Sequence, residues 1–449
     1  MKERRLLAIL IAIAGLFALA PLAEARPLYF GISANSRTAG TSAQDLSAET
    51  GVTRLREDIE WAEVEPKDDE WDWSKFDDVY ETAAERGLSI LPITNTSPCW
   101  AVPAETKEGL CGETLPASDS DYAEFVAKVA ERYGPGGDFW ESHPELNGSL
   151  ALRHIEIWNE PYFGAAGPEE VDAGRYADLY KAAVIAGRAA NGSTRYLVQS
   201  TIDARTGPEP SDYIDWPASL IAAEPSIGSY IDGIAMHPYP GSHGVNYEPE
   251  NGTDEAFLNT SINYLEWKGL GINKPVWITE VGYSSCADEA NHCVPGATQA
   301  AREEKKAEWL DELLTELGKD KYGYVHSVYL YNLEQWTPST EPDAVKSDWY
   351  GLAYGPTNEP LPAWNSFTTA AEEFDGVPEP NTTITGQTGK GQNRTFTFVV
   401  NDSTAVTECK GENAWSPCTS PKSVSGVHSF SVRGINAEAV ESSPASFSW

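Results

Sequence analysis

The sequence predicts an α/β fold, a (β/α)8 TIM barrel followed by a small β-sandwich. Between residues 27 and 372, short β-rich segments alternate with helical patterns, which is typical of βα units repeated around a parallel sheet. Eight such pairs in about 350 residues suit a closed barrel better than an open doubly wound sheet. The chain has no GxGxxG motif after the first strand and no GxxxxGK[ST] motif, so nucleotide binding lacks its usual support.

The expected helices between the strands carry apolar residues at helical spacing. Tyr176, Leu179 and Tyr180 form one such stripe, and Leu310, Leu313, Leu314 and Leu317 form another. One stripe of each helix can therefore pack against the barrel. The expected strands are 28–33, 52–58, 88–94, 150–158, 195–200, 230–236, 276–280 and 325–332.

The composition changes on both sides of the barrel region. Residues 1–25 combine basic residues, an apolar stretch and a small-residue cleavage site, as in a signal peptide, so the mature chain is expected to begin near Arg26. An uncleaved membrane anchor is the alternative. Residues 373–382 hold prolines, a glycine and acidic residues, which indicates a linker. Residues 383–449 contain short β-rich segments without a helical period, which predicts an immunoglobulin-like or fibronectin-like β-sandwich.

The charge balance bears on the partners of the chain. Its 68 acidic and 32 basic residues give a net charge of −36, which argues against binding nucleic acid or an anionic membrane through a basic surface. A neutral polysaccharide would not be repelled. No segment after the N-terminal one is apolar enough to span a bilayer, so no stable membrane insertion is expected once the signal is cleaved.

The six cysteines fall into three pairs of near neighbours in the sequence. An even number behind a signal peptide favours local disulfides, and the absence of CxxC spacing disfavours zinc sites. We therefore expect a secreted, extracellular protein, either free or associated with a cell surface, that needs no metal or cofactor. The expected disulfides are Cys99–Cys111, Cys286–Cys293 and Cys409–Cys418.

Two of the expected strands end on a glutamate. The fourth strand leads into Asn159 and Glu160, and the seventh ends at Glu280. Barrel enzymes place their chemistry at the C-terminal ends of the strands, and we expect the fourth and seventh strands to face each other across the barrel. Two carboxyl groups in one cleft can supply the acid and the nucleophile that glycoside hydrolysis needs. Arg56, near the end of the second strand, is the candidate for keeping Glu280 ionised. The bland alternative for either glutamate is a helix cap or a solvated side chain.

Several segments resemble the retaining glycoside hydrolases of clan A. Residues 157–161 (Ile-Trp-Asn-Glu-Pro) and 277–282 (Trp-Ile-Thr-Glu-Val-Gly) look like the strand-four and strand-seven motifs of that clan. Residues 56–66 and 71–77 are similar to family 5-like and family 39-like members, and the resemblance spans nearly all of 27–372. It implies that Glu160 is the general acid/base and Glu280 the nucleophile.

The resemblance also implies roles around the two glutamates. Asn159 would hydrogen-bond the sugar 2-hydroxyl, His237 would line the site, and Tyr239 would touch the nucleophile; a structural histidine and tyrosine are the alternatives. Because a sugar face stacks on an aromatic ring, Trp100 and Trp336 are the candidate platforms.

The prediction for function is hydrolysis of O-glycosidic bonds in a β-linked polysaccharide or oligosaccharide by double displacement. The alternatives are a transglycosylase, in which a sugar hydroxyl replaces water, and a barrel that binds glycans without cleaving them.

Overall fold

A computed structural model of the chain describes residues 29–33, 41–107, 109–165, 167, 170–207, 212–248, 256–286, 293–336, 349–355, 357–374, 382–400, 406–411, 415–435 and 445–448. The expected signal peptide and most of the expected linker lie outside the described residues. No helix in these ranges is both long and apolar enough to cross a bilayer.

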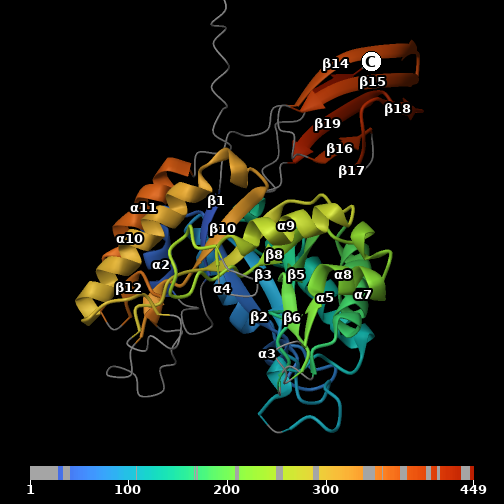
Figure 1. Cartoon of the computed structure of the whole chain (residues 1–449). Helices are drawn as coiled ribbons and strands as arrows, with labels where there is room; N and C mark the ends of the chain where they lie inside the picture. The colour runs from blue at the N-terminus through green and yellow to red at the C-terminus, as the bar shows by residue number, and fades with distance from the viewer. Residues whose placement is uncertain are drawn as a thin grey trace, which may run out of the picture.

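The centre of the molecule is a closed barrel of eight parallel strands, which confirms the predicted fold class (Figure 1). The strands follow one another around the barrel in the order β1-β2-β3-β4-β5-β8-β9-β10 and close between β10 and β1. Each lies within about four residues of its expected position, the error usual for boundaries read from a sequence. Their bounds are β1 Tyr29–Ser33, β2 Arg54–Glu60, β3 Ser89–Asn95, β4 His154–Ile157, β5 Arg195–Ser200, β8 Gly233–Met236, β9 Val276–Val281 and β10 Val325–Tyr331.

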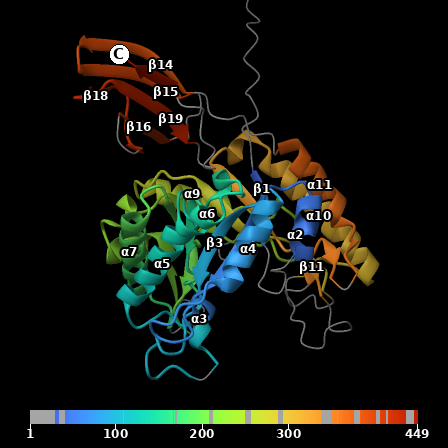
Figure 2. The same cartoon turned by 180° about the vertical axis from the view of Figure 1, so that it is seen from behind.

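Helices surround the barrel, as both views show (Figures 1 and 2). Several begin at a polar N-cap side chain that accepts a backbone N–H of the first turn, such as Asp172 before α7 and Thr298 before α10. The helices are α2 Thr41–Glu49, α3 Trp61–Val64, α4 Ser74–Glu85, α5 Asp119–Tyr133, α6 Asp138–Ser142, α7 Ala173–Ala190, α8 Trp216–Ala223, α9 Asn259–Gly269, α10 Gln299–Leu317 and α11 Ala363–Phe374.

The core has two parts. A large apolar cluster fills the space between strands and helices, while a small cluster inside the barrel consists of Leu91, Leu197, Ala235, Trp277 and Tyr329. This inner cluster forms an apolar floor beneath the C-terminal ends of the strands. Polar side chains at those ends are thereby separated from the opposite mouth of the barrel.

The C-terminal module consists of antiparallel sheets, in agreement with the predicted β-sandwich. One sheet pairs β14-β15-β18 and the other β17-β16-β19-β20. Its first strand, β14, begins at Thr382, inside the expected linker, and its polar sequence had not indicated a strand. The strands are β14 Thr382–Lys390, β15 Asn393–Val400, β16 Val406–Lys410, β17 Ser416–Pro417, β18 Lys422–Ser425, β19 Ser429–Ile435 and β20 Ala445–Ser448.

Two small features on the barrel were not expected from the sequence. A hairpin of β6 Asp203–Arg205 and β7 Tyr213–Asp215 follows β5, and a three-stranded sheet of β11 Glu334–Gln335, β12 Ala353–Tyr354 and β13 Glu359–Pro360 follows β10. Segments of two or three residues are too short to show a strand period. The three predicted disulfides are present: Cys99–Cys111, Cys286–Cys293 and Cys409–Cys418.

Candidate active site

The side chains of Glu160 and Glu280 both lie beside the same histidine. His237, just after β8, lies with Nδ1 2.9 Å from Oε1 of Glu160 and 3.7 Å from Oε2 of Glu280. Those two oxygens are therefore no farther apart than the sum of these distances. The side chain of His237 is only 1% exposed, whereas those of Glu160 and Glu280 are 28% and 13% exposed. Both carboxylates thus reach solvent from a common buried anchor.

The expected placement of the two strands needs a correction. Strands β4 and β9 are separated by β5 and β8 on one side of the barrel, so they do not lie diametrically opposite each other. In a barrel of eight, a strand faces the one four positions away, and the seventh strand is three positions from the fourth. The shorter path around the barrel brings the two carboxylates closer together than opposite strands would.

Glu160 lies on an unusual stretch of backbone. Trp158 and Glu160 both have positive φ angles, 64° and 44°, a backbone conformation that residues other than glycine rarely adopt. Such strain usually persists only where the surrounding structure imposes it, and it concentrates at functional sites. Trp158 is held by a bond from its backbone N–H to the carbonyl of Thr94 on β3. The chain turns sharply here, directly before Glu160.

Arg56, on β2, connects the site residues. Its guanidinium donates to Oε1 of Glu280 at 2.7 Å, to Oδ1 of Asn159 at 3.3 Å and to Ser33 at 3.1 Å, and its Nε donates to Glu156 at 2.5 Å. Burial alone would lower the pKa of Arg56, but the charges of Glu156 and Glu280 raise it, so the residue stays cationic. Arg56 therefore holds one oxygen of Glu280 and orients the amide of Asn159.

Glu156 was missed by the sequence analysis. It is fully buried on β4 and accepts hydrogen bonds from Arg56, from Gln199 and, at 2.8 Å, from Thr279. Burial would raise its pKa, but the charges of Arg56 and His237 outweigh it and lower the pKa to about 2. The sequence did contain a signal, because a glutamate inside a buried strand is rare unless it is paired.

The surroundings of His237 keep it charged. Burial disfavours the imidazolium, yet the charge of Glu280 and hydrogen bonds with Glu156 and Glu160 raise its pKa to about 10. Its Nε2 lies 3.1 Å from Oγ1 of Thr279, which in turn donates to Glu156. A charged His237 therefore donates to Glu160 on one side and to the buried polar layer on the other.

Tyr239 makes the contact expected of it. Its hydroxyl donates to Oε2 of Glu280 at 2.6 Å, the oxygen that Arg56 does not hold. The Tyr239 ring lies edge-on to Tyr350 and Tyr331, with centroid distances of 5.5 and 6.2 Å. Both oxygens of Glu280 thus have a donor, and three tyrosines form an aromatic wall beside it.

The two expected tryptophan platforms each donate a hydrogen bond from the indole N–H. The indole of Trp100 donates to the backbone carbonyl of Glu65 at 3.0 Å and packs edge-on against Trp61. Trp336, which is half-buried, donates to Glu334 at 3.2 Å. Stacking of a sugar on either ring remains a prediction.

A groove lies beside the segment that carries Glu160, because Trp158 and Pro161 are among its lining residues. It has a volume of about 520 Å³ and lies between the segment bridged by Cys99–Cys111 and the segment after Glu160. Phe163 lines it and is 67% exposed, an unusual state for a large apolar side chain. Phe163 was not among the expected site residues, because exposure cannot be read from a single aromatic residue in a loop.

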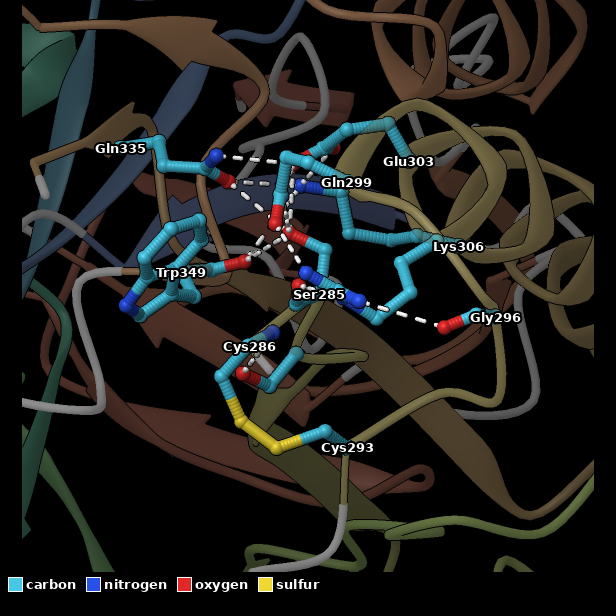
Figure 3. Close-up of a disulfide and its surroundings, with 11 residues drawn as sticks. Ser285, Cys286, Cys293, Gly296, Gln299, Glu303, Lys306, Gln335 and Trp349 are labelled. Atoms are coloured by element: carbon cyan, nitrogen blue, oxygen red, sulfur yellow. Dashed lines mark hydrogen bonds and ion pairs between the residues drawn. A yellow bond between two sulfur atoms is a disulfide. The ribbon is translucent and has the colours of Figure 1, made fainter. Parts of the chain in front are cut away.

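A buried network anchors the loops on the other side (Figure 3). Lys306 of α10 is 2% exposed and contacts Glu303, Gln335 and the carbonyl of Gly351 at 2.8 to 2.9 Å. Gln335 is flanked in the sequence by Glu334 and Trp336. The Cys286–Cys293 disulfide follows Ser285, which is part of the same network. The network fixes the segment that carries Trp336.

Among the described residues, one cluster of carboxylates has the spacing of a cation site: Glu65, Asp68 and Asp69. Glu65 already accepts hydrogen bonds from the indole of Trp61 and the backbone of Asp69, each at 2.8 Å. Two of its three members are exposed, and the cluster does not include either catalytic candidate.

Solved structures of other proteins are similar to this chain over most of its length. The chain is similar to a family 39 glycoside hydrolase from the gut symbiont Bacteroides cellulosilyticus WH2, with 16% identity and a TM-score of 0.53 over 94% of this chain and 81% of that one. It is also similar to a GH5_18 protein from Streptomyces cattleya in complex with GlcNAc, with 16% identity and a TM-score of 0.53 over 79% and 82% of the two chains. For a GH5_18 protein from Bifidobacterium longum subsp. infantis the values are 14%, 0.53, 78% and 80%.

No family model matches the chain, and no curated protein sequence matches it. At these identities the structural likeness establishes the fold alone, a (β/α)8 barrel shared with these glycoside hydrolase structures. The resemblance read from the sequence is thereby confirmed for the fold.

Proposed function

We propose that the protein is a retaining glycoside hydrolase with Glu160 as general acid/base and Glu280 as nucleophile. The observation that carries this proposal is the shared contact with His237, at 2.9 and 3.7 Å. These two distances set an upper limit on the separation between Oε1 of Glu160 and Oε2 of Glu280. The limit lies at the lower end of the range of about 6.5–9.5 Å that accommodates a water molecule in inverting enzymes. A direct attack by Glu280, which needs about 5–5.5 Å, fits this geometry better.

The reaction proceeds in two displacements. Glu280 attacks the anomeric carbon while Glu160 gives its proton to the leaving oxygen, which breaks the glycosidic bond and leaves a glycosyl ester on Glu280. Glu160, now a carboxylate, takes a proton from water as the water oxygen attacks the anomeric carbon, which breaks the bond to Glu280 and releases the sugar with its original configuration.

The neighbours of the glutamates support these roles. Arg56 and Tyr239 donate to separate oxygens of Glu280, which fixes the orientation of the nucleophile. Asn159, oriented by Arg56, is suited to bind the 2-hydroxyl, a contact that strengthens as positive charge develops on the sugar. A charged His237 beside Glu160 stabilises the carboxylate that exists between the two steps.

The substrate we propose is a β-linked polysaccharide or oligosaccharide. The groove beside Glu160, with its exposed Phe163, gives room for sugar units on the leaving-group side. Three disulfides suit an oxidising compartment, so we place the activity outside the cytoplasm.

The test combines activity with stereochemistry. Wild type, Glu160→Gln, Glu280→Gln and the surface control Glu131→Gln are assayed for release of reducing ends from β-glucans, xylans, mannans and galactans, and NMR follows the anomer first released. We expect the wild type and Glu131→Gln to release the β-anomer, and each active-site variant to lose at least about 10³-fold in kcat.

Azide separates the two roles. Added to Glu280→Ala, it replaces the nucleophile and yields an α-glycosyl azide, whereas with Glu160→Ala it intercepts the ester and yields a β-glycosyl azide. Activity that survives Glu280→Gln, or an inverted product from the wild type, contradicts the assignment. Binding of a glycan without cleavage by the wild type supports a barrel that only binds.

A further inference from the structure

A further carboxylate, Asp58, lies on the same strand as Arg56. Side chains two positions apart on a strand point to the same face, so Asp58 points to the inside of the barrel, as Arg56 does. Leu55 and Ile59, at the alternate positions, belong to the apolar cluster between strands and helices. Asp58 lies about 7 Å further along the strand than Arg56, towards the C-terminal end of the barrel.

An amide on the neighbouring strand holds this carboxylate. Nδ2 of Asn95, the last residue of β3, donates to Oδ1 of Asp58 at 2.6 Å. Asn95 is only 9% exposed, and among the described residues none donates to its own Oδ1. A buried acceptor without a donor is unfavourable, so this orientation of the amide serves Asp58 and not the oxygen of Asn95. Asn95 is therefore a positioning residue for the Asp58 carboxylate.

The second oxygen of Asp58 remains for a ligand. In the part of the chain that the structure describes, the side chain of Asp58 forms no ion pair, and its hydrogen bond is the one from Asn95. The residue is half-buried rather than enclosed. Neither Asp58 nor Asn95 lines the groove beside Glu160, so they do not belong to the proposed leaving-group side.

The surroundings of Asp58 place it near the nucleophile. Burial raises its pKa, the charge of Arg56 and the hydrogen bond from Asn95 lower it, and the charge of Glu280 is a further cause that raises it. Arg56 donates to Glu280 and to Asn159, so it borders the sugar that these two residues would attack and bind. Asp58, the next inward-facing residue of β2, borders the same sugar, which is the glycone.

The charges around this sugar disfavour both sugar acids and sugar amines. Arg56 and His237 are buried cations, and both are already paired with carboxylates of the site. A sugar acid would bring its carboxylate towards Asp58, and a sugar amine would bring its ammonium towards the two cations. Like charges placed side by side in a binding site weaken binding. A neutral sugar avoids both contacts, and its hydroxyls can donate to a carboxylate.

We propose that Asp58, held by Asn95, is a specificity-determining residue for the glycone. Its second oxygen accepts a hydrogen bond from a hydroxyl of the sugar that Glu280 attacks, and its charge excludes a sugar that carries a carboxylate. The substrates are therefore β-glycosides of neutral sugars and not β-uronides. This inference rests on the proposed hydrolytic function and narrows its substrate class.

The experiment compares kcat/KM at pH 7 and fixed ionic strength for full-length wild type and three variants. The substrates are the 4-nitrophenyl β-glycosides of glucose, galactose, mannose and xylose, the neutral polymers named above, and 4-nitrophenyl β-glucuronide and β-galacturonide. Asp58→Asn removes the charge and nearly keeps the shape, whereas Asn95→Ala releases the carboxylate and keeps its charge. Asp78→Asn makes the same chemical change on the exposed face of α4 and is the matched control.

We expect the wild type to cleave a neutral glycoside at least about 100-fold faster than the matching uronide. In Asp58→Asn, kcat/KM for neutral substrates should fall about tenfold or more, and the preference for the neutral glycoside over the uronide should fall about tenfold. Asn95→Ala should lose activity but keep the preference, which a loss of folding alone would not produce. Asp78→Asn should behave as wild type.

Two kinds of result overturn the inference, and they are distinguishable. Hydrolysis by the wild type of a uronide as fast as of the neutral glycoside, or full activity of Asp58→Asn on the neutral substrates, overturns the role of Asp58 and leaves the hydrolytic function intact. A wild type that is inactive on every glycoside and polymer overturns the hydrolytic function, and this inference with it. If Asp58→Asn does not fold, the wild-type preference and its retention in Asn95→Ala decide.

Discussion

Glu156 is the residue on which the cluster around the two glutamates depends. Its buried carboxylate contacts Arg56, which holds Glu280, and through Thr279 it reaches His237, which holds Glu160. Arg56 and His237 are both buried cations, and Glu156 is the carboxylate buried most deeply beside them. We therefore treat Glu156 as a positioning residue for both halves of the reaction.

Replacement of Glu156 by Gln tests this role. The change leaves two buried cations with less compensation, so we expect unfolding in urea to require about 3–5 kcal/mol less at pH 7. The kcat should fall as well, because Arg56 and His237 lose their anchor. Glu131→Gln, on the exposed face of α5, is the matched control and should change neither quantity.

The pH dependence of the same variant has a definite sign. The pKa of Glu156 lies at about 2 in the fold, below its ordinary value of 4.5, so its stabilisation is present above pH 4.5 and is lost as the pH falls towards 2. The difference in stability between wild type and Glu156→Gln should therefore shrink between pH 4.5 and 2. A constant difference across this interval contradicts the lowered pKa.

Phe163 gives a prediction about substrate length. Its exposed ring lines the groove beside Glu160, so loss of the ring should weaken binding of oligosaccharides by about 1 kcal/mol, or about fivefold in KM. We expect Phe163→Ala to show this change with an oligosaccharide and none with an aryl glycoside of a single sugar. Phe163→Tyr keeps the ring face and should behave as wild type. An equal effect on both substrates places the defect elsewhere.

At the scale of elements, close packing of a helix against a strand can require a residue that has a low helix propensity. Gly187 lies in the middle of α7, where glycine is unfavourable, but a methyl group there would lie 2.1 Å from the hydroxyl of Tyr196 on β5. Helix α7 can pack against this strand only because Gly187 has no side chain. The neighbouring pattern of apolar residues predicted the helix but not this contact.

Gly187→Ala is expected to destabilise the protein despite the better helix former. Overpacking costs about 1–3 kcal/mol, which over most of this range exceeds the gain of about 1 kcal/mol from propensity. Gly269→Ala, in α9, meets nothing within 4 Å and should be neutral or slightly stabilising. Differential scanning calorimetry of both variants decides between the two effects; a stabilised Gly187→Ala contradicts the packing argument.

At the scale of the whole molecule, the module has a much smaller core than the barrel. The core of the module consists of Phe396, Phe398, Phe430, Val432 and Cys409, and Cys409 is part of a disulfide. A domain with so little apolar core depends on such a cross-link. The barrel, by contrast, has a core that extends around all its strands.

Removal of Cys409–Cys418 should therefore affect the module alone. In the Cys409→Ala, Cys418→Ala double variant we expect a loss of about 2–3 kcal/mol in the unfolding of the module and unchanged hydrolysis. Calorimetry should show a shifted low-temperature transition beside an unchanged barrel transition. The corresponding Cys99, Cys111 variant should instead alter activity, because its loop borders the groove. Lost activity in the module variant contradicts this division.

The amino-acid sequence by itself determined the barrel, its eight strands and the three disulfides. The strands and helices follow from the spacing of apolar residues within short segments. The disulfides could be predicted because the paired cysteines lie within 12 residues of each other. Motifs at two strand ends also singled out Glu160 and Glu280, and with them Arg56, Asn159, His237 and Tyr239, as candidates for one site. The structure brings all six together.

Only the tertiary structure decided what surrounds them. The burial of Glu156 and the exposure of Phe163 each depend on residues distant in the chain that meet in space. Glu156 and Arg56, for example, are 100 positions apart, and only the barrel places them in contact. Electrostatic environment and solvent exposure are properties of the folded arrangement, which no local pattern of residues specifies.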